Sequence, residues 1–204
     1  MCERRTRKEV AFYEGKLKSS ELPEKVNLAE VTAEMNDLWE KSVLNIKGGE
    51  VREHAATLVL DSNGSLRMDN LVEGGPSSVT PNRDVGADRT LVGTFHTHPY
   101  PDGTTGMAFS GADIAYAINK GDTMTLVQSG QDTFALVHTE KTPASVSRAV
   151  LEAEFDVLFD EYVIEDAMSD QEAALVTNLD LCKRYGLAFY LGKSDGKLEV
   201  VYKP

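Results

Sequence analysis

Three two-residue turn signals, each between apolar runs, constrain the fold of this chain more than any other feature. They are Asn63-Gly64 within residues 53–72, Ser129-Gly130 within 123–139 and Asp195-Gly196 within 187–202. Glycine after a small polar residue favours the tight turns that join neighbouring antiparallel strands, because glycine readily adopts a positive φ. The flanking runs are rich in residues that strands prefer. We therefore predict three β-hairpins.

The other apolar residues follow a strand period once and a helical period elsewhere. The stretch "TLVGTFHTHP", residues 90–99, is predicted to be a strand that ends at its proline. Apolar residues recur at helical spacing in three segments, 28–44, 110–121 and 144–185. The chain therefore combines strands and helices.

Two details of these helices can be predicted. Asn27 is expected to cap the first helix, with Glu30 three residues later completing a capping box. A break near Ser169 is expected to divide the last segment into two helices. The apolar face of that segment is wide and includes Val150 and Val157, so we expect these side chains to lie in the core.

The length of 204 residues suits one domain with a substantial core. We predict a single α/β domain over residues 28–204, in which a mixed or antiparallel sheet is flanked by helices. The helices and hairpin of residues 144–204 form its C-terminal part. Residues 1–27 are charged and weakly periodic, and are predicted to form an N-terminal arm.

Composition excludes several classes of function. The net charge of −12 argues against binding to nucleic acid or to an anionic membrane surface. No apolar run approaches the roughly 20 residues of a membrane span. The first twenty residues lack the apolar core of a signal peptide, so we expect a cytoplasmic protein, with export by another route left open. The two cysteines, Cys2 and Cys182, exclude a cysteine-rich zinc site, so a transition metal here needs histidine and carboxylate ligands.

Two of the four histidines, His96 and His98, stand two residues apart on the predicted strand. Side chains alternate along a strand, so both point to the same face with Cα atoms about 6.5 Å apart. That separation lets two imidazoles converge on one ion at about 2.0–2.1 Å each. A pair of histidines that serves only packing or the surface is the other interpretation of this motif alone.

Ser110 and Asp113 have a structural interpretation as well. Ser-x-x-Asp before an apolar helical run is a capping box. Such a box places the aspartate in the first helical turn, near the end of the preceding strand. Capping and metal binding by Asp113 are therefore compatible.

The joint pattern is "HTHP", the ten-residue spacer 100–109 and "SGAD". It resembles the JAMM signature of the JAB/MPN metalloprotease family, in its prokaryotic type, which has an upstream glutamate, H-[S/T]-H-P, a spacer and S-x-x-D. Thr97 and Pro99 fit the signature too. The motif core spans residues 53–113, and the resemblance extends over about 28–140.

The resemblance implies an MPN-like fold and a zinc-dependent peptidase or isopeptidase. His96, His98 and Asp113 would bind Zn²⁺ and leave one position for water. Glu53 would be the general base, and Ser110 would donate a hydrogen bond to the developing oxyanion. Glu50 competes with Glu53 for the role of base, since it stands three residues earlier.

The resemblance implies a protein or peptide substrate, and ubiquitin-like proteins are one such class. The insertions by which eukaryotic members bind ubiquitin are not evident, so ubiquitin itself is not assigned as the substrate. Two alternatives stay open: a non-catalytic scaffold on the same fold, and a bacterial effector or toxin domain delivered into another cell. His54 and His138 are expected to be structural or exposed. The oligomeric state and any activating partner are left open.

Overall fold

The computed structural model describes residues 5–204, so Cys2 and the start of the predicted arm lie outside the described residues. Residues 5–204 form helices α1 (Arg7–Tyr13), α2 (Thr32–Ser42), α3 (Gly111–Lys120), α4 (Arg148–Ile164) and α5 (Asp170–Tyr185), with short 3₁₀ turns at Ser19–Glu21 and Ile46–Gly48. The strands are β1 (Lys25–Asn27), β2 (His54–Asp61), β3 (Leu66–Glu73), β4 (Arg89–Thr97), β5 (Met124–Ser129), β6 (Asp132–Val137), β7 (Ala188–Lys193) and β8 (Lys197–Tyr202).

The strands of residues 5–204 form one sheet in the order β1-β8-β7-β6-β5-β4-β2-β3. In this described part of the chain β4 and β5 are the parallel pair, and the other neighbours are antiparallel. The prediction of an α/β protein with a mixed sheet is therefore confirmed. The predicted hairpins are β2–β3, β5–β6 and β7–β8. The second turns one residue later than predicted, because Ser129 still pairs with Asp132.

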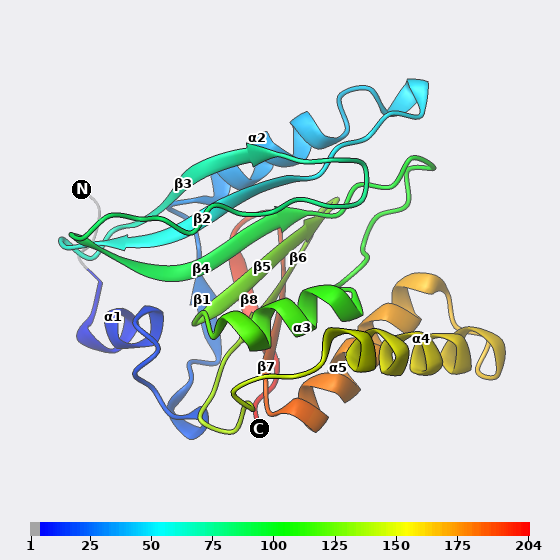
Figure 1. The fold of residues 1–204 in the computed structure, drawn as a ribbon. Coiled ribbons are helices and arrows are strands. Elements are labelled where there is room, and N and C mark those ends of the chain that lie inside the picture. The colour runs from blue at the N-terminus through cyan, green and yellow to red at the C-terminus, as the bar shows by residue number, and fades with distance from the viewer. Residues whose placement is uncertain (1–4) are drawn as a thin grey trace.

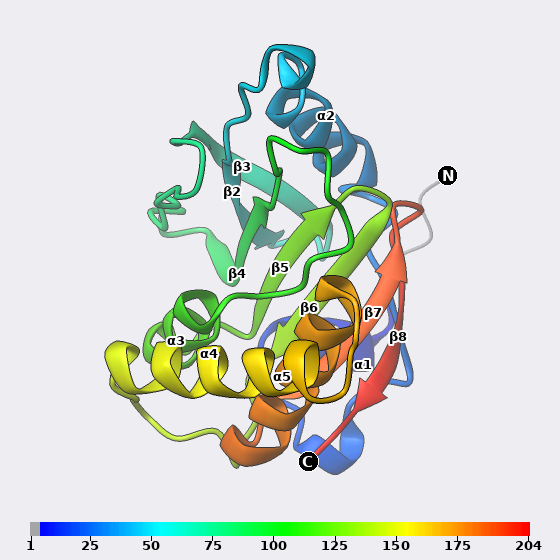
Figure 2. The same ribbon diagram turned by 90° about the vertical axis from the view of Figure 1, so that its right-hand side faces the viewer.

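Helices cover both faces of the strongly twisted sheet (Figure 1). The helices α3, α4 and α5 lie together on one side, and α2 lies on the opposite side (Figure 2). Each side has its own core. One contains Met35 and Leu38 of α2 with Phe95 of β4, and the other contains Ile114 of α3, Leu181 of α5 and Phe189 of β7.

The parallel pair determines where α3 lies. Parallel neighbours need a crossover connection, and here α3 is the crossover between β4 and β5. The chain leaves the carboxyl end of β4 and returns to the start of β5, so the first turn of α3 comes back toward the end of β4. In open α/β sheets, ligands bind in the crevice outside the carboxyl ends of the strands.

The predicted start of the first helix is wrong. Asn27 is the last residue of β1, where it pairs with Lys197, and its side chain accepts the N–H of Ala29 at 3.0 Å. Strand pairing therefore takes the residue expected as cap, and α2 begins at Thr32. Glu30 instead accepts the N–H of Leu66 at 2.6 Å.

The prediction that α4 buries a wide apolar face is also wrong. Leu151 is buried, but Val150 is 54% exposed and Val157 is 66% exposed. The reason is that α4 packs on α3 and α5 as an outer layer, as Figure 2 shows, and not flat on the sheet. Gly111 permits this approach, because a Cβ there would lie 2.8 Å from the Cα of Glu152.

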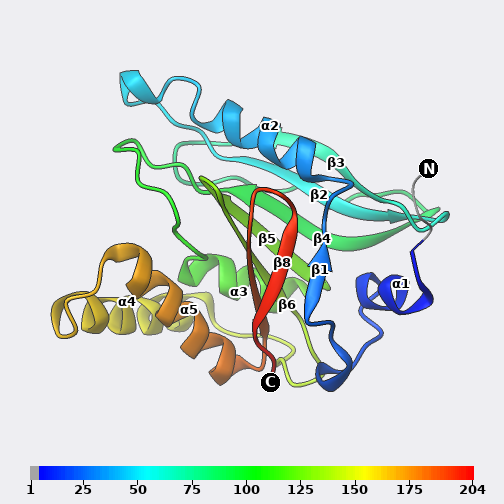
Figure 3. The same cartoon turned by 180° about the vertical axis from the view of Figure 1, so that it is seen from behind.

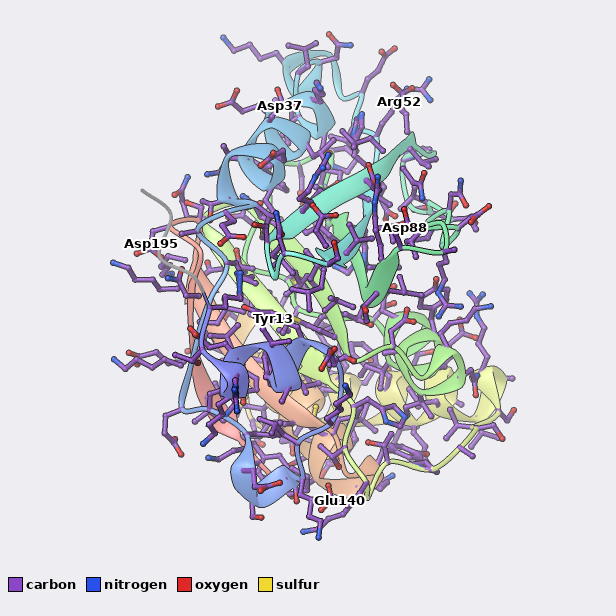
Figure 4. The ribbon with its side chains drawn as sticks, turned by 90° about the vertical axis from the view of Figure 1, so that its left-hand side faces the viewer. Tyr13, Asp37, Arg52, Asp88, Glu140 and Asp195 are labelled. Atoms are coloured by element: carbon purple, nitrogen blue, oxygen red, sulfur yellow. The ribbon has the colours of Figure 1, made fainter. Side chains whose placement is uncertain are left out.

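The described part of the arm, residues 5–27, packs against the body of the protein. Its strand β1 lies beside β8 at the edge of the sheet, as seen from behind in Figure 3. On the side shown in Figure 4, Tyr13 of α1 faces inward, and its hydroxyl donates to the carbonyl of Asn27 at 3.0 Å. Among residues 5–204 no helix has both the length and the apolar character needed to cross a membrane.

Candidate metal centre

His96 lies in β4 and His98 directly follows the last residue of that strand, with both side chains turned to the same side. Each is 7% exposed, and His96 lies against the ring of Phe109 at a centroid distance of 6.4 Å. The Nδ1 atom of His98 is 3.0 Å from the carbonyl oxygen of Ala108. Because a carbonyl only accepts, Nδ1 carries the proton and donates it, which leaves the Nε2 lone pair of the neutral ring free for an ion.

The first turn of α3 brings Asp113 to the same point. Ser110 is the N-cap, and its hydroxyl accepts the N–H of Asp113 at 3.3 Å. The Asp113 carboxylate accepts the Ser110 N–H at 2.9 Å and its hydroxyl at 2.6 Å. The capping box predicted from the sequence is therefore present, and it turns the carboxylate toward the histidines.

Three donor atoms converge between β4 and α3. The two Nε2 atoms of His96 and His98 are 3.0 Å apart. Oδ1 of Asp113 lies 3.4 Å from Nε2 of His96, and Oδ2, the other carboxylate oxygen, lies 3.2 Å from Nε2 of His98. In a tetrahedral zinc site with bonds of about 2.05 Å, neighbouring donors would be about 3.3 Å apart. The spacing of the donors is close to this value, and one donor atom from each of the three side chains lies within 4.8 Å of the others. Within residues 5–204 these three side chains are the group that could hold a metal.

The charges of this cluster reinforce one another. Burial opposes ionisation of Asp113, but the charges and hydrogen bonds of the two histidines outweigh it and hold its pKa well below the usual range. Burial likewise disfavours the charged form of His98, yet the hydrogen bond and charge of Asp113 raise its pKa above the usual value. Without a metal ion, a proton on His98 therefore compensates the buried carboxylate.

Glu53 lies beside the cluster, just before β2. In the β2–β4 register Ala55 pairs with His96, so extending that register by two residues puts Glu53 next to His98 on the same face. Glu53 is half-buried and lines the cleft that contains the three donors. Burial raises its pKa, and the charges of the histidines partly oppose the rise. Glu50, the competing residue, is exposed and lies outside the cleft lining.

A hydrogen-bonded network behind the histidines was not found by sequence reasoning. The Thr97 hydroxyl accepts the N–H of His54 at 2.9 Å and lies 2.7 Å from the hydroxyl of Ser42. Ser42 also lies 3.0 Å from Nδ1 of His54 and donates to the carbonyl of Leu38. This network joins α2, the start of β2 and the residue between the two histidines. The alternation of strand side chains, which turns Thr97 away from the cluster, is its only sequence signal.

The cleft around the cluster has a volume of about 510 Å³. The loop 76–81 forms one wall, and Tyr116 of α3 and Arg148 of α4 contribute to the other. The hydroxyl of Thr57 donates to the carbonyl of Asn82 and so ties this loop to β2. This volume lies in the range of about 300–1,000 Å³ typical of ligand pockets. His138, half-buried after β6, does not line it.

The structure thus brings His96, His98, Asp113, Glu53 and Ser110 into one cleft. It leaves Glu50, His54 and His138 outside that cleft. Comparisons of the chain with family models, with curated proteins and with solved structures find no match.

Proposed function

We propose that this protein is a zinc-dependent hydrolase of amide bonds, a peptidase or isopeptidase of the JAMM type on an MPN-like fold. One observation carries the proposal: two imidazole Nε2 atoms and a carboxylate converge at 3.0–3.4 Å, with a second carboxylate in the same cleft. Capping alone explains Ser110 and Asp113, but it does not explain two histidines turned toward the cap.

The donor set favours zinc as the metal. Two histidines and one carboxylate with an open fourth position are a ligand set of catalytic zinc sites. Calcium and magnesium prefer oxygen ligands. Among residues 5–204 the one cysteine, Cys182, is buried elsewhere in the core and does not supply a thiolate to this site. When bound, zinc would lower the pKa of a water molecule to about 7 and polarise the substrate carbonyl.

The protein's own residues would then move the protons. Glu53 would accept the proton of the attacking water and later deliver it to the leaving amine. Its half-buried carboxylate lines the cleft beside the three proposed ligands, which supports this role. Ser110 is the proposed oxyanion donor. Its hydroxyl donates to Asp113 in this structure, so that role requires the hydroxyl to turn toward the substrate.

The metal can be tested by elemental analysis of the purified protein. We expect about one zinc per chain in the wild type. His96→Ala and His98→Ala should abolish zinc binding, while His138→Ala, which changes a histidine outside the cleft, should retain it. Stoichiometric zinc in both cleft variants would refute the proposed site.

Catalysis can be tested with the pair Glu53→Gln and Glu50→Gln, offered ubiquitin-like fusions, peptides and isopeptide conjugates as substrates. Glu53→Gln keeps the shape of the side chain but cannot accept a proton. Turnover should therefore fall at least about 100-fold while zinc content stays unchanged. Glu50→Gln should change neither. If the zinc-loaded wild type cleaves nothing in the panel, the hydrolase proposal fails and the non-catalytic scaffold is the better interpretation.

A further inference from the structure

Two buried threonines line the cleft beside the metal cluster. Thr94 of β4 and Thr125 of β5 are 1% and 2% exposed, and both belong to the lining of the cleft. Neither hydroxyl has a hydrogen-bond partner among residues 5–204. Buried hydroxyls are usually paired, so two neighbouring ones without a partner require an explanation.

These threonines belong to a row that crosses three strands. Thr94 pairs with Thr57 of β2 on one side and with Thr125 of β5 on the other. Neighbouring strands are about 4.8 Å apart, so the three side chains lie next to one another on the face of the sheet that borders the cleft. The hydroxyl of Thr57 donates to the carbonyl of Asn82 in the loop between β3 and β4. Thr57 is thus paired with this loop, whereas its neighbours Thr94 and Thr125, which line the cleft, have no partner among residues 5–204.

The row lies one side chain away from the reactive centre. Thr94 precedes His96 by two residues on the same face, which is about 6.5 Å along the strand. A rotation about χ1 exchanges the hydroxyl and the methyl group of a threonine, so both hydroxyls can turn to a group that enters the cleft. Valine has the same shape and would leave no unpaired hydroxyl. Thr133 and Thr177 are also buried with unpaired hydroxyls among residues 5–204, and Thr94 and Thr125 differ from them in lining the cleft as direct neighbours.

We propose that Thr94 and Thr125 form a polar subsite for one short, uncharged, hydrogen-bonding side chain of the substrate, such as that of threonine, serine or asparagine. A role of this subsite in catalysis rests on the proposed function. The recognised residue of the substrate would then stand next to the bond that is cleaved. An uncharged group is favoured because the floor of the subsite offers hydroxyls and no counter-charge, and a buried charge needs a partner. Arg148 does not supply one, since it is 70% exposed and pairs with Glu152.

The subsite can be tested without catalysis by two isosteric probes, N-acetyl-threonine methylamide and N-acetyl-valine methylamide. Binding to the full chain would be followed by NMR of labelled threonine methyl groups, with and without zinc. The threonine probe should shift the signals of Thr94 and Thr125 and bind about tenfold more tightly than the valine probe. The double variant Thr94→Val/Thr125→Val should lose or reverse this preference.

A matched control is Thr133→Val on β6. Thr133 is also fully buried with an unpartnered hydroxyl among residues 5–204, but it lies outside the cleft lining, so this variant should keep the preference. Equal affinity of the wild type for both probes, or no shift at Thr94 and Thr125 up to the solubility of the probes, would overturn the subsite. If the preference is found in a protein that binds no zinc or cleaves no peptide, the proposed function fails and the subsite stands.

Discussion

The first turns of α3 and α5 have the same local structure and different surroundings. Ser110 and Ser169 each accept the N–H of the residue three positions on, at 3.3 and 3.4 Å. Asp113 and Glu172 each accept the serine N–H, at 2.9 and 3.0 Å, and the serine hydroxyl, at 2.6 and 2.7 Å. Both helices end at a glycine in the left-handed conformation. As caps, the two boxes are equivalent.

The carboxylates differ in what else they meet. Hydrogen bonds from Ser169 alone lower the pKa of the exposed Glu172. The pKa of Asp113 is lowered against the effect of burial, because two histidines face it. The capping box thus determines where a helix begins and how its carboxylate points. The strand that lies opposite determines whether that carboxylate can be a ligand.

The largest expected difference between the boxes is in zinc binding. Asp113→Asn should weaken zinc affinity by about 1,000-fold, since one of three ligands contributes on the order of a third of the roughly 10–16 kcal/mol of a tight zinc site. Glu172→Gln should leave the affinity unchanged. Zinc titration against a chelator of known affinity measures both. Equal zinc affinities in the two variants would show that Asp113 only caps the helix and does not bind the metal.

The serines should differ in their effect on turnover. Ser110→Ala should lower kcat by about 100-fold, the low end of the loss of one oxyanion donor, because its hydroxyl is shared with Asp113. Ser169→Ala should leave kcat unchanged. Steady-state kinetics on any substrate found with the panel would measure this. Equal rates for both variants would contradict the oxyanion role and leave the metal site intact.

In the metal-free protein, the two capping boxes should differ in how their contribution to the unfolding free energy depends on pH. The lowered pKa of Asp113 means that its contribution is present above its ordinary value of 3.8 and is lost as pH falls through the lowered value. The raised pKa of His98 means that its contribution is complete below its ordinary value of 6.5 and is lost as pH rises through the raised value. The pair therefore stabilises most between those ordinary values.

Asp113→Asn should accordingly cost about 1.5–3 kcal/mol of unfolding free energy near pH 5.5, and less near pH 9. Glu172→Gln should show the same cost at both pH values, because the carboxylate of Glu172 is ionised throughout and faces no histidine. Urea unfolding of the chelator-treated proteins gives both numbers. An equal loss of unfolding free energy at both pH values for Asp113→Asn would contradict the raised pKa of His98 in the metal-free protein.

The smallest expected effect is common to both boxes. Ser110→Ala and Ser169→Ala should each lower the unfolding free energy of the metal-free protein by about 1 kcal/mol, the usual cost of losing an N-cap. Thermal unfolding at one pH is sufficient to compare them. A much larger loss in Ser110→Ala would show that its box also supports the packing of α4 over α3.

Much of the local structure could be predicted from the sequence. The hairpin turns, the start of α3 at Ser110 and the break at Ser169 depend on a few adjacent residues, and each lies where its turn or cap chemistry predicts, within one residue. The shared face of His96 and His98 follows from the two-residue period of a strand. These features depend on backbone preferences and on hydrogen bonds that short segments can make alone.

Only the tertiary structure decided which of these segments meet. Strand pairing with β8 overrode the cap expected at Asn27, and the position of α4 as an outer layer left Val157 exposed. Ser42 reaches Thr97 across 55 residues of sequence. The hydroxyl of Thr57 reaches the carbonyl of Asn82, whereas the hydroxyl of its strand neighbour Thr94 has no partner among residues 5–204. The physical reason is that sheet register and layer packing arise from the whole chain, whereas caps, turns and strand alternation are properties of neighbouring residues.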